Sequence, residues 1–394
     1  MRVDIVTKEY PPEIYGGAGV HVAELVKALR STLDVRVRAF GADRDEAGTT
    51  AYRSPVELAS ANPALQTLGT DLVMVPDIAG ADVVHSHTWY ANFAGHIASQ
   101  LHGIPHVLTA HSLEPLRPWK AEQLGGGYAV SSGVERVAYE NAAAIIAVSA
   151  GMRADILRSY PQVDPARVRV IHNGIDVEAW HPVVDDAFLR AQGIDPDRPS
   201  VVFVGRITRQ KGLPYLLRAA ALLPPEVQLI LCAGAPDTPE IMAEVQELVR
   251  GLQRTRQGVV WIERMLPRPE LSAVLSAATT FVCPSVYEPL GIVNLEAMAC
   301  GAAVVGTATG GIPEVVADGT TGRLVPIDQV QDGTGTPVDP DRFVTDLAAV
   351  LTEMVSDPAR AKAYGEAGRR RAAEEFSWAA IADTTRALYA EVIG

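Results

Sequence analysis

Hydrophobic and polar residues follow two alternating periods along the whole chain. Short runs rich in β-branched residues are separated by longer segments whose apolar residues recur at helical spacing, as do Val22, Leu25, Val26 and Leu29. In the first half, the runs that we expect to form strands are 2–6, 34–40, 82–87, 106–111, 143–149 and 168–174. In the second half, they are 200–205, 227–234, 259–264, 279–285, 302–307 and 321–326. This alternation predicts parallel sheets with right-handed crossovers.

The length of the chain and one break in its pattern predict two domains. A single core rarely grows to 394 residues. Residues 177–200 are punctuated by proline and aspartate and lie between the two series of strands, where a linker belongs. We therefore expect an α/β protein of two doubly wound, Rossmann-like domains, residues 1–180 and 195–376. The helical tail, 377–394, is expected to pack back on the first domain.

Composition and charge exclude several classes of protein. A net charge of -13 argues against general affinity for nucleic acid or an anionic membrane. No apolar run approaches the roughly 20 residues of a membrane span, and charge and proline interrupt residues 1–12 too early for a signal peptide. We therefore expect a cytoplasmic protein. Cys232, Cys283 and Cys300 show no CxxC spacing and are expected to be reduced core thiols.

Glycines separate the first strand from the first helix. Gly16, Gly17 and Gly19 precede the apolar stripe of that helix, and glycines in such a turn let backbone amides approach a phosphate or a sugar. The match to GxGxxG is incomplete because Val22 stands where the third glycine belongs, so a dinucleotide site is disfavoured. A tight turn without a ligand is the alternative.

Two cations follow the strand expected at 200–205. Arg206 stands just past its end and Lys211 five residues later, between Gly205 and Gly212. In parallel sheets, ligands bind at the carboxyl ends of strands. An arginine fork and a lysine point charge held there can clamp a diphosphate. The alternative is a loop whose charges are simply solvated.

Two carboxylates, Glu288 and Glu296, lie in the apolar segment VYEPLGIVNLEAMACG at 286–301. An unpaired buried carboxylate is strongly unfavourable, so each must be exposed or hydrogen-bonded. We expect a loop around Glu288 and a helix from about Gly291 to Gly301, whose first amides, at residues 290–292, favour an anion. A carboxylate beside that anion suits hydroxyl donors, such as those of a sugar and a ribose. An ordinary amphipathic helix would explain Glu296 but not Glu288.

Histidines end two strands of the first half. His85 and His87 could bind a metal from alternate strand positions, but no third ligand stands at a sensible spacing, so we expect no metal site. His111 ends the strand at 106–111, where it could contact a reacting sugar. A structural histidine is the alternative.

In combination, the GGAG turn, the Arg206 and Lys211 pair, and the E-x7-E of Glu288 and Glu296 resemble the retaining glycosyltransferases of family 4. The segments TKEYPPEIYGGAGVHV and CPSVYEPLGIVNLEAMACG are most similar to the glycogen-synthase type of actinobacteria. The resemblance spans the chain from residue 7 to the last helix and implies the GT-B fold, in which two Rossmann-like domains face each other across a cleft. One departure is Ile14, which stands where larger glycogen and starch synthases carry the lysine of KTGGL.

The resemblance implies a role for each motif in binding and using the donor. Arg206 and Lys211 would neutralise the leaving diphosphate, and Gly17 would offer its amide to the same group. Glu296 would accept from the ribose hydroxyls. The backbone of Leu290, Gly291 and Ile292 would hold glucose and phosphate.

Two further residues are implied at the reacting sugar. Glu288 would accept from glucose hydroxyls, and His111 would bind the transferred glucose near its anomeric carbon. With Arg206 and Lys211 they form the expected catalytic set. No metal or other cofactor is expected, because the two cations stabilise the leaving charge.

The acceptor is expected on the first domain. If it is glucose 1-phosphate, it needs cations, and the implied acceptor residues are Glu9, Arg117, Lys120, Tyr128 and Arg136. If it is an α-glucan, aromatic platforms matter more, and the candidates are Trp89, Tyr90 and Trp119. A mobile solvated loop is a third reading of residues 112–136.

The implied reaction is retaining transfer of glucose from ADP-glucose to glucose 1-phosphate, giving maltose 1-phosphate, or to a glycogen-type glucan. Two alternatives stay open: a family 4 transferase with another donor, such as UDP-glucose, and another small acceptor, and a sugar-nucleotide-binding protein without catalysis. We expect no nucleic-acid or membrane partner, and the sequence leaves a homodimer open.

Overall fold

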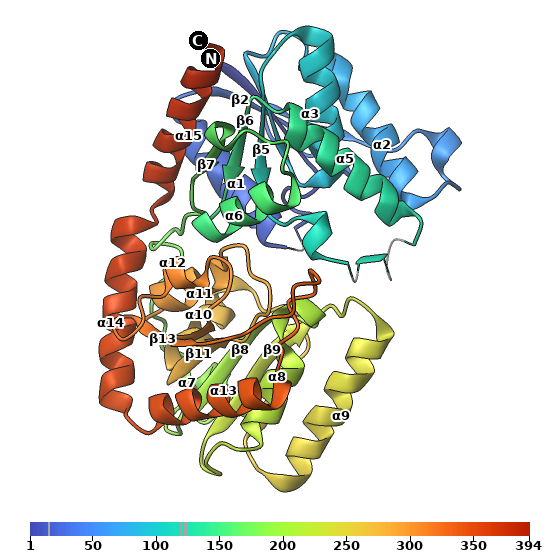
Figure 1. Cartoon of the computed structure of the whole chain (residues 1–394). Helices are drawn as coiled ribbons and strands as arrows, with labels where there is room; N and C mark the ends of the chain where they lie inside the picture. The colour runs from blue at the N-terminus through green and yellow to red at the C-terminus, as the bar shows by residue number, and fades with distance from the viewer. Residues whose placement is uncertain (15, 119, 122–124) are drawn as a thin grey trace. The chain divides into compact units, whose positions relative to one another are not determined.

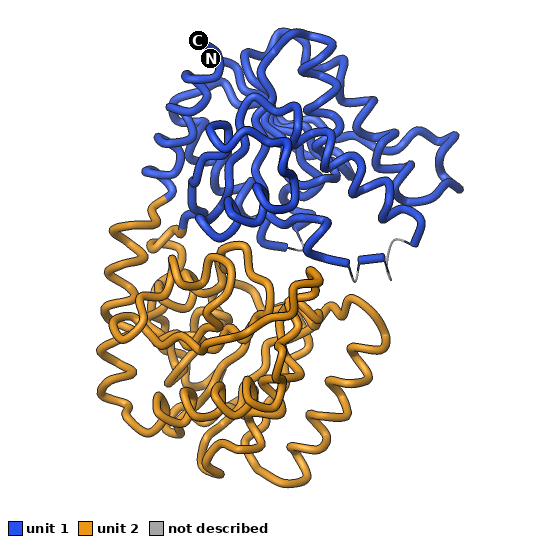
Figure 2. The backbone as a smooth tube through the Cα atoms, in the orientation of Figure 1, with its two compact units in different colours: residues 1–174, 378–394 blue, residues 175–377 orange. Residues whose placement is uncertain are grey.

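The computed structural model describes residues 1–14, 16–118, 120–121 and 125–394. The chain forms two compact units (Figure 2). Unit 1 consists of residues 1–174 and 378–394, and unit 2 of residues 175–377. The residues expected to form a linker, 177–200, thus belong to unit 2.

Unit 1 is built on a parallel sheet in the strand order β3-β2-β1-β4-β5-β6-β7. Its strands are β1 (Arg2–Thr7), β2 (Asp34–Phe40), β3 (Thr49–Tyr52), β4 (Val83–His87), β5 (His106–Ala110), β6 (Ala144–Ala147) and β7 (Val168–Val170). Its helices include α1 (Gly17–Leu29), α2 (Pro63–Met74), α3 (Trp89–His102), α5 (Gly127–Asn141), α6 (Ala150–Ser159) and α15 (Trp378–Ile393).

Both faces of this sheet are covered by helices (Figure 1). Val3 and Ile5 of β1 face a core shared with α1 and α15, whereas Val6 faces a second core shared with α2 and α3. The alternation follows from the period-2 geometry of a strand. The final helix, α15, lies against α1 and contributes Trp378 and Tyr389 to the first core.

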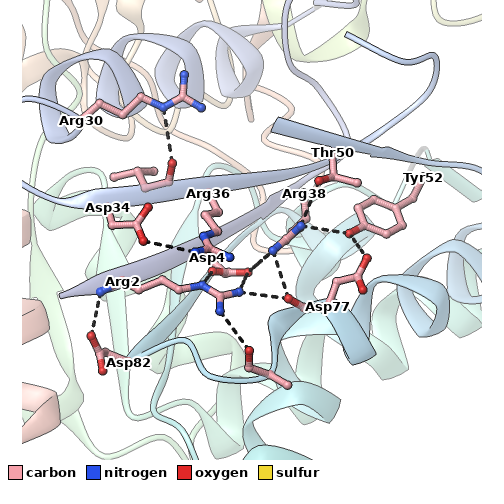
Figure 3. A network of polar contacts seen from close by, with 12 residues as sticks. Arg2, Asp4, Arg30, Asp34, Arg36, Arg38, Thr50, Tyr52, Asp77 and Asp82 are labelled. Carbon is pink, nitrogen blue, oxygen red and sulfur yellow. Dashed lines mark hydrogen bonds and ion pairs between the residues drawn. The ribbon is translucent and has the colours of Figure 1, made fainter. Parts of the chain in front are cut away.

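A network of ion pairs around the buried Asp4 joins strands β1 and β2 (Figure 3). The fully buried carboxylate of Asp4 accepts from Arg2 at 2.8 Å and from Arg38 at 3.0 Å. Arg38 also donates to the hydroxyl of Tyr52 at 3.3 Å, and that hydroxyl donates to Asp77 at 2.7 Å. Two arginines therefore compensate one buried carboxylate, as burial of a charge requires.

Unit 2 repeats the plan with a parallel sheet in the order β10-β9-β8-β11-β12-β13. Its strands are β8 (Ser200–Arg206), β9 (Gln228–Gly234), β10 (Val259–Ile262), β11 (Thr280–Cys283), β12 (Ala303–Thr307) and β13 (Gly322–Val325). Its helices are α7 (Asp186–Ala191), α8 (Leu213–Ala220), α9 (Pro239–Thr255), α10 (Arg268–Ala277), α11 (Ile292–Ala299), α12 (Ile312–Val315), α13 (Pro340–Val355) and α14 (Pro358–Glu375). Helices α8, α9 and α13 share one core with the sheet, and α11 packs on α14.

The predicted α/β fold with two parallel sheets is confirmed, and each run expected to form a strand contains one. The sequence reading missed β3, which spans only Thr49–Tyr52. This strand lies at the edge of its sheet, and just one of its residues, Tyr52, is buried. Because β3 reads Thr-Thr-Ala-Tyr, it lacks the apolar run that identified the other strands, including the even shorter edge strand β7.

Two smaller expectations also have an answer. Cys232, Cys283 and Cys300 are buried and carry free thiols, as predicted. None of the helices in the described part of the chain combines the length and the apolar character that a membrane span requires.

Candidate active site

In unit 2, the strand order reverses between β8 and β11, which are neighbours in the sheet. At such a switch point the loops that leave the two strands diverge, and this is where open α/β sheets bind ligands. Arg206 is the last residue of β8, and Lys211 ends the short 3₁₀ helix Arg209–Lys211 behind it. Glu288 follows β11. The fold thus brings together the two motifs of unit 2 that the sequence singled out.

Local geometry fixes Lys211 beside the end of β11. The side chain of Thr208 accepts a hydrogen bond from the Lys211 amide at 3.3 Å. Gly212 has φ +65, and a Cβ atom there would lie 2.0 Å from the carbonyl oxygen of Pro284. A side chain at this position would therefore push the two loops apart, so the position requires glycine.

The central contact is the ion pair between Lys211 and Glu288. Lys211 Nζ lies 2.7 Å from Glu288 Oε2, and the two side chains are 20% and 7% exposed. Ser285 Oγ donates to the same oxygen at 2.9 Å, and Cys283 Sγ lies 3.9 Å from it. Burial lowers the pKa of Lys211, but the Glu288 carboxylate more than offsets this, so the pKa lies above its ordinary value. The lysine is therefore charged at neutral pH.

Arg206 has a carboxylate partner of its own. Its Nη1 lies 3.1 Å from Asp237 Oδ1, and a third of the arginine side chain is exposed. Each cation of the expected diphosphate clamp is thus paired in this structure. An incoming anion would have to compete with Asp237 for Arg206, whereas Lys211 could contact it while still held by Glu288.

The loop after β11 leads into helix α11, which starts where the sequence pattern predicted a helix. Gly291, with φ +90, caps α11, and the helix starts at Ile292. The carbonyl oxygen of Glu288 accepts from the amide of Gly311 at 2.9 Å. A Cβ atom at Gly310 would lie 1.9 Å from that carbonyl oxygen. The loop after β12 therefore packs closely against the loop that carries Glu288. Leu290, in the Glu288 loop, is buried.

Glu296 lies one turn into α11 and is partly exposed. Burial raises the pKa of its carboxyl to about 7, against the opposing effect of Arg268 and Lys211. The carboxyl is thus poised to change its charge near neutral pH. Glu288 and Glu296 occupy different places, one on the loop and one on the helix, as the sequence predicted.

In unit 1, the order of strands reverses between β1 and β4. The glycine turn follows β1, and α1 begins at Gly17 with Gly16 as its cap. Glu9 Oε2 accepts from the Gly16 amide at 2.8 Å, and a Cβ atom at Gly19 would lie 2.8 Å from the Cβ of Glu9. The buried Glu9 side chain, expected at the acceptor, therefore holds the glycine turn in this structure.

Histidines gather at the same switch point. His87 ends β4, His111 follows β5, and His21 is buried on α1. His87 Nδ1 and His111 Nε2 lie 3.0 Å apart, and the ring of His21 lies 4.8 Å from that of His111 between centroids. Burial lowers the pKa of all three, that of His21 to about 4 and those of His87 and His111 well below the ordinary value. The rings are therefore neutral at physiological pH.

Three of the residues expected at the acceptor lie near the buried Glu114: Lys120 at its carboxylate, and Tyr128 and the Arg117 amide at its backbone carbonyl oxygen. Lys120 Nζ lies 3.5 Å from Glu114 Oε1, and the Tyr128 hydroxyl donates to the Glu114 carbonyl oxygen at 2.7 Å. Burial lowers the pKa of Lys120 to about 8, with Arg117 acting in the same direction. Arg117 itself donates to Ser112 at 3.2 Å.

A second carboxylate, Glu135, completes this network. It accepts from the Glu114 amide at 2.8 Å and from the Tyr160 hydroxyl at 2.5 Å. Burial, together with the Glu114 charge, raises the pKa of Glu135. Arg136, the remaining cation expected at the acceptor, is exposed on α5, eight residues and about 12 Å along the helix from Tyr128. The structure therefore separates Arg136 from the other three.

The aromatic candidates for a glucan platform differ in their surroundings. Trp89 is only 3% exposed, so its ring cannot stack on a sugar in this structure. Tyr90 is partly exposed, and Lys8 Nζ lies 3.8 Å from the centre of its ring, with Lys120 Nζ at 5.5 Å. Trp119 lies outside the described residues.

Comparison with known proteins decides the family. The model of "Glycosyltransferase Family 4" matches residues 15–179, and that of "Glycosyl transferases group 1" matches residues 198–352. Over the full length of both chains, the protein is 58% identical to the α-maltose-1-phosphate synthase of Mycolicibacterium smegmatis and 57% identical to that of Mycobacterium tuberculosis.

The chain belongs to glycosyltransferase family 4.

A solved structure agrees with this family at the level of the fold. Sucrose-phosphate synthase from Thermosynechococcus elongatus superposes with a TM-score of 0.78 at 24% identity, covering 99% of this chain and 98% of that one. The predicted family and GT-B fold are thus confirmed. This glycosyltransferase carries the motif residues of both units on the loops that leave the switch points of its two sheets.

Several side chains at these loops were missed from the sequence. Asp237 and Gly310 approach the motifs of unit 2 from other loops, Ser285 contacts Glu288 within the same loop, and Lys8 and His21 lie beside the expected residues of unit 1. A signal existed for Ser285, which stands three residues before Glu288 at the end of a strand. None existed for the others, because their contacts join segments far apart in the sequence.

Proposed function

We propose that this glycosyltransferase moves glucose from ADP-glucose to glucose 1-phosphate with retention of the α-configuration and forms an α-1,4 bond. The product is then maltose 1-phosphate. Transfer to the end of a glycogen-type glucan is a second outcome of the same chemistry. One observation carries the choice of product: identity of 57–58% over the whole of both chains to two α-maltose-1-phosphate synthases. ADP-glucose as the donor is what the resemblance of the sequence motifs implies.

The arrangement in unit 2 supports departure of a nucleoside diphosphate. When the bond to the anomeric carbon breaks, the sugar becomes oxocarbenium-like and the leaving phosphate gains negative charge. Lys211 is charged and held by Glu288, so it needs no reorganisation as that charge develops. Arg206 and the amides at the start of α11 add positive potential at the same switch point.

Glu288 is proposed to bind the glucosyl group rather than to attack it. Its Oε2 already accepts from Lys211 and Ser285, with the Cys283 thiol in contact. A carboxylate oxygen with these donors is a weak nucleophile, because the charge that would attack carbon is already stabilised. In the proposed reaction the acceptor hydroxyl attacks on the face from which the diphosphate leaves, and the leaving phosphate takes its proton.

The remaining donor contacts follow the loops. Glu296 accepts from the ribose hydroxyls, and its raised pKa means that these hydrogen bonds strengthen as the carboxyl ionises. Leu290, Gly291 and Ile292 contact glucose and phosphate through the backbone at the start of α11. Gly17 offers its amide to the diphosphate, and His111 donates to the transferred glucose.

Glucose 1-phosphate is favoured over glucan by the surroundings of the aromatic residues. Trp89 is buried and is not a cation. Lys120 is buried as well, on Glu114, but it lies together with Arg117 near Tyr128, so this cluster offers positive charge to a phosphate that displaces Glu114. We therefore assign Lys120, Arg117 and Tyr128 to the acceptor phosphate. The exposed Arg136 and the buried Glu9 remain weaker candidates, the first for its distance and the second for its bond to Gly16. Transfer is proposed to need no metal, since Lys211 and Arg206 stabilise the leaving group.

A four-way incubation tests the proposal. ADP-glucose and UDP-glucose are each offered with glucose 1-phosphate or with glycogen, and products are identified by mass. A disaccharide phosphate formed from ADP-glucose supports the proposed acceptor. Rapid turnover of UDP-glucose but not of ADP-glucose would favour the alternative donor. No turnover of either donor would favour a sugar-nucleotide-binding protein.

A further inference from the structure

Three histidines of unit 1 come from three different elements and converge on one point. His21 is on α1, His87 ends β4 and His111 follows β5, and one ring nitrogen from each lies within 4.8 Å of the other two. They meet where the strand order reverses between β1 and β4. We propose that this triad binds a divalent cation of the Zn²⁺ type and that the bound ion inhibits transfer.

The spacing of the nitrogens suits a shared metal. Two imidazole nitrogens on a tetrahedral zinc, each about 2.0–2.1 Å from it, lie about 3.3 Å apart. His87 Nδ1 and His111 Nε2 are already 3.0 Å apart. The nitrogen of His21 has to approach by less than 2 Å, estimated from the 4.8 Å limit on the triad. Small side-chain rotations are therefore enough.

Hydrogen bonding at His21 points to a missing ligand. The ring is 3% exposed, and its one hydrogen-bonding neighbour among the described residues is Asn173, whose hydrogen bond to the ring departs from ordinary geometry; the second ring nitrogen has no hydrogen bond among these residues. Buried polar atoms normally have partners, and each exception asks for an explanation. By contrast, His85 uses both nitrogens, on the Tyr389 hydroxyl at 2.6 Å and on Thr109 at 2.8 Å, and so stands outside the triad.

The chemistry of the triad selects the kind of ion. Three neutral imidazoles suit zinc, cobalt, nickel or copper rather than magnesium or calcium, which prefer oxygen. The rings are neutral at physiological pH because burial lowers the pKa of each, so binding need not displace a proton. The hydrogen that His87 and His111 share moves to the remote nitrogen of its own ring, which frees both lone pairs for the metal. A partly exposed His111 leaves a path of entry.

Inhibition rests on the proposed function, in which His111 contacts the transferred glucose. His111 Nε2 faces His87 Nδ1 at 3.0 Å, so a metal bound there holds the whole ring in the triad. Closing the triad moves its rings by up to about 2 Å, which displaces His111 from the position in which its other nitrogen would contact the sugar. The effect is therefore opposite to that of a catalytic metal: chelators should raise the activity of metal-loaded enzyme and leave that of metal-free enzyme unchanged.

The test uses Co²⁺, whose visible absorption reports its coordination, together with Zn²⁺ as competitor. The full-length protein, freed of metal, is titrated as wild type, as His21→Asn and as His111→Asn. His181→Gln is the matched control, because His181 is an exposed histidine of unit 2. Thermal unfolding without metal checks that each variant is folded, and the second triad variant serves if the first is not.

We expect one Co²⁺ per chain with the intense bands of a four-coordinate site, displaced by Zn²⁺. Loss of an outer-shell partner of a metal ligand lowers metal affinity roughly 10- to 100-fold. Each triad variant should lose more Co²⁺ affinity than that, whereas His181→Gln should bind Co²⁺ as wild type does. Absence of Co²⁺ bands in the wild type, or bands that survive both triad substitutions, would overturn the site. Binding without loss of transfer at saturating Zn²⁺ would overturn the inhibition.

These readouts separate the inference from the proposed function. Co²⁺ spectra need no substrate, so the site can stand when transfer from ADP-glucose fails. Conversely, transfer by the metal-free enzyme can stand when no Co²⁺ binds.

Discussion

Replacing Lys211 by alanine tests the proposed role of the donor site most sharply. The change removes the ammonium that lies 2.7 Å from Glu288 and, in the proposed reaction, beside the leaving phosphate. Loss of one preorganised group that stabilises developing charge costs about 2.7–4 kcal/mol, or roughly 10²–10³ in kcat. We therefore expect kcat for Lys211→Ala to fall by roughly that factor.

The same substitution has a separate effect on stability. Glu288 is 7% exposed and would keep Ser285 and Cys283 as donors after losing its cation. Breaking a fully buried ion pair costs about 3–5 kcal/mol. Because Lys211 is 20% exposed, we discount this to about 1–3 kcal/mol in the free energy of unfolding. A protein with this loss stays folded at 25 °C, so the kinetic effect can be measured.

The assay is initial-rate transfer from ADP-glucose at saturating acceptor, with urea unfolding on the same preparations. Arg218→Ala is the matched control, since it breaks the exposed ion pair with Glu244 on α8 and α9 and should change neither quantity appreciably. A folded Lys211→Ala enzyme with kcat within about threefold of wild type would refute the reasoning, because it would place the leaving charge elsewhere.

Three further predictions concern other parts of the molecule. Glu296→Gln should raise KM for the donor more than it lowers kcat. The wild-type KM for the donor should fall as pH rises through about 7, where Glu296 ionises. If the substitution left the pH profile of this KM unchanged, the assignment of Glu296 would be contradicted. Glu135 has a raised pKa in the folded protein, so the unfolded chain releases this proton first and stability falls as pH rises above the ordinary glutamate range. The melting temperature of Glu135→Gln should therefore gain on that of wild type as pH rises, and a constant difference would count against a neutral Glu135. Asp4→Asn should lower the free energy of unfolding, measured in urea, by about 3–5 kcal/mol without changing kcat. Asp34→Asn loses only an exposed partner and should stay within about 0.5 kcal/mol of wild type. Equal losses of stability in the two variants would mean that burial of Asp4 is not decisive.

Sequence patterns were sufficient for the architecture because strands and helices differ in period. The strands of both sheets carry apolar runs, and only β3 was missed, because Thr49–Tyr52 reads TTAY and has no such run. The sequence also brought out the motifs of unit 2. Arg206 is the last residue of one strand, Lys211 follows it, and Glu288 lies in the loop after another strand, and the strand order makes those strands neighbours.

The partners of these side chains could not be predicted from the sequence. Asp237 pairs with Arg206 from a loop after another strand, and nothing in its own surroundings marks it. Lys120 and Tyr128 looked like free acceptor contacts, yet both contact Glu114. His21 reads as one polar residue on an apolar helix, and only the fold brings it to His87 and His111. Such contacts depend on the packing of distant segments, which local periods do not encode.

The most direct test of the central claim is the structure of the product formed from ADP-glucose and glucose 1-phosphate. The proposal predicts a disaccharide phosphate whose new bond joins C1 to O4 with α-configuration, as nuclear magnetic resonance of the purified product can establish. A β-linked product would contradict retention. Release of free glucose without any disaccharide phosphate would contradict glucose 1-phosphate as the acceptor.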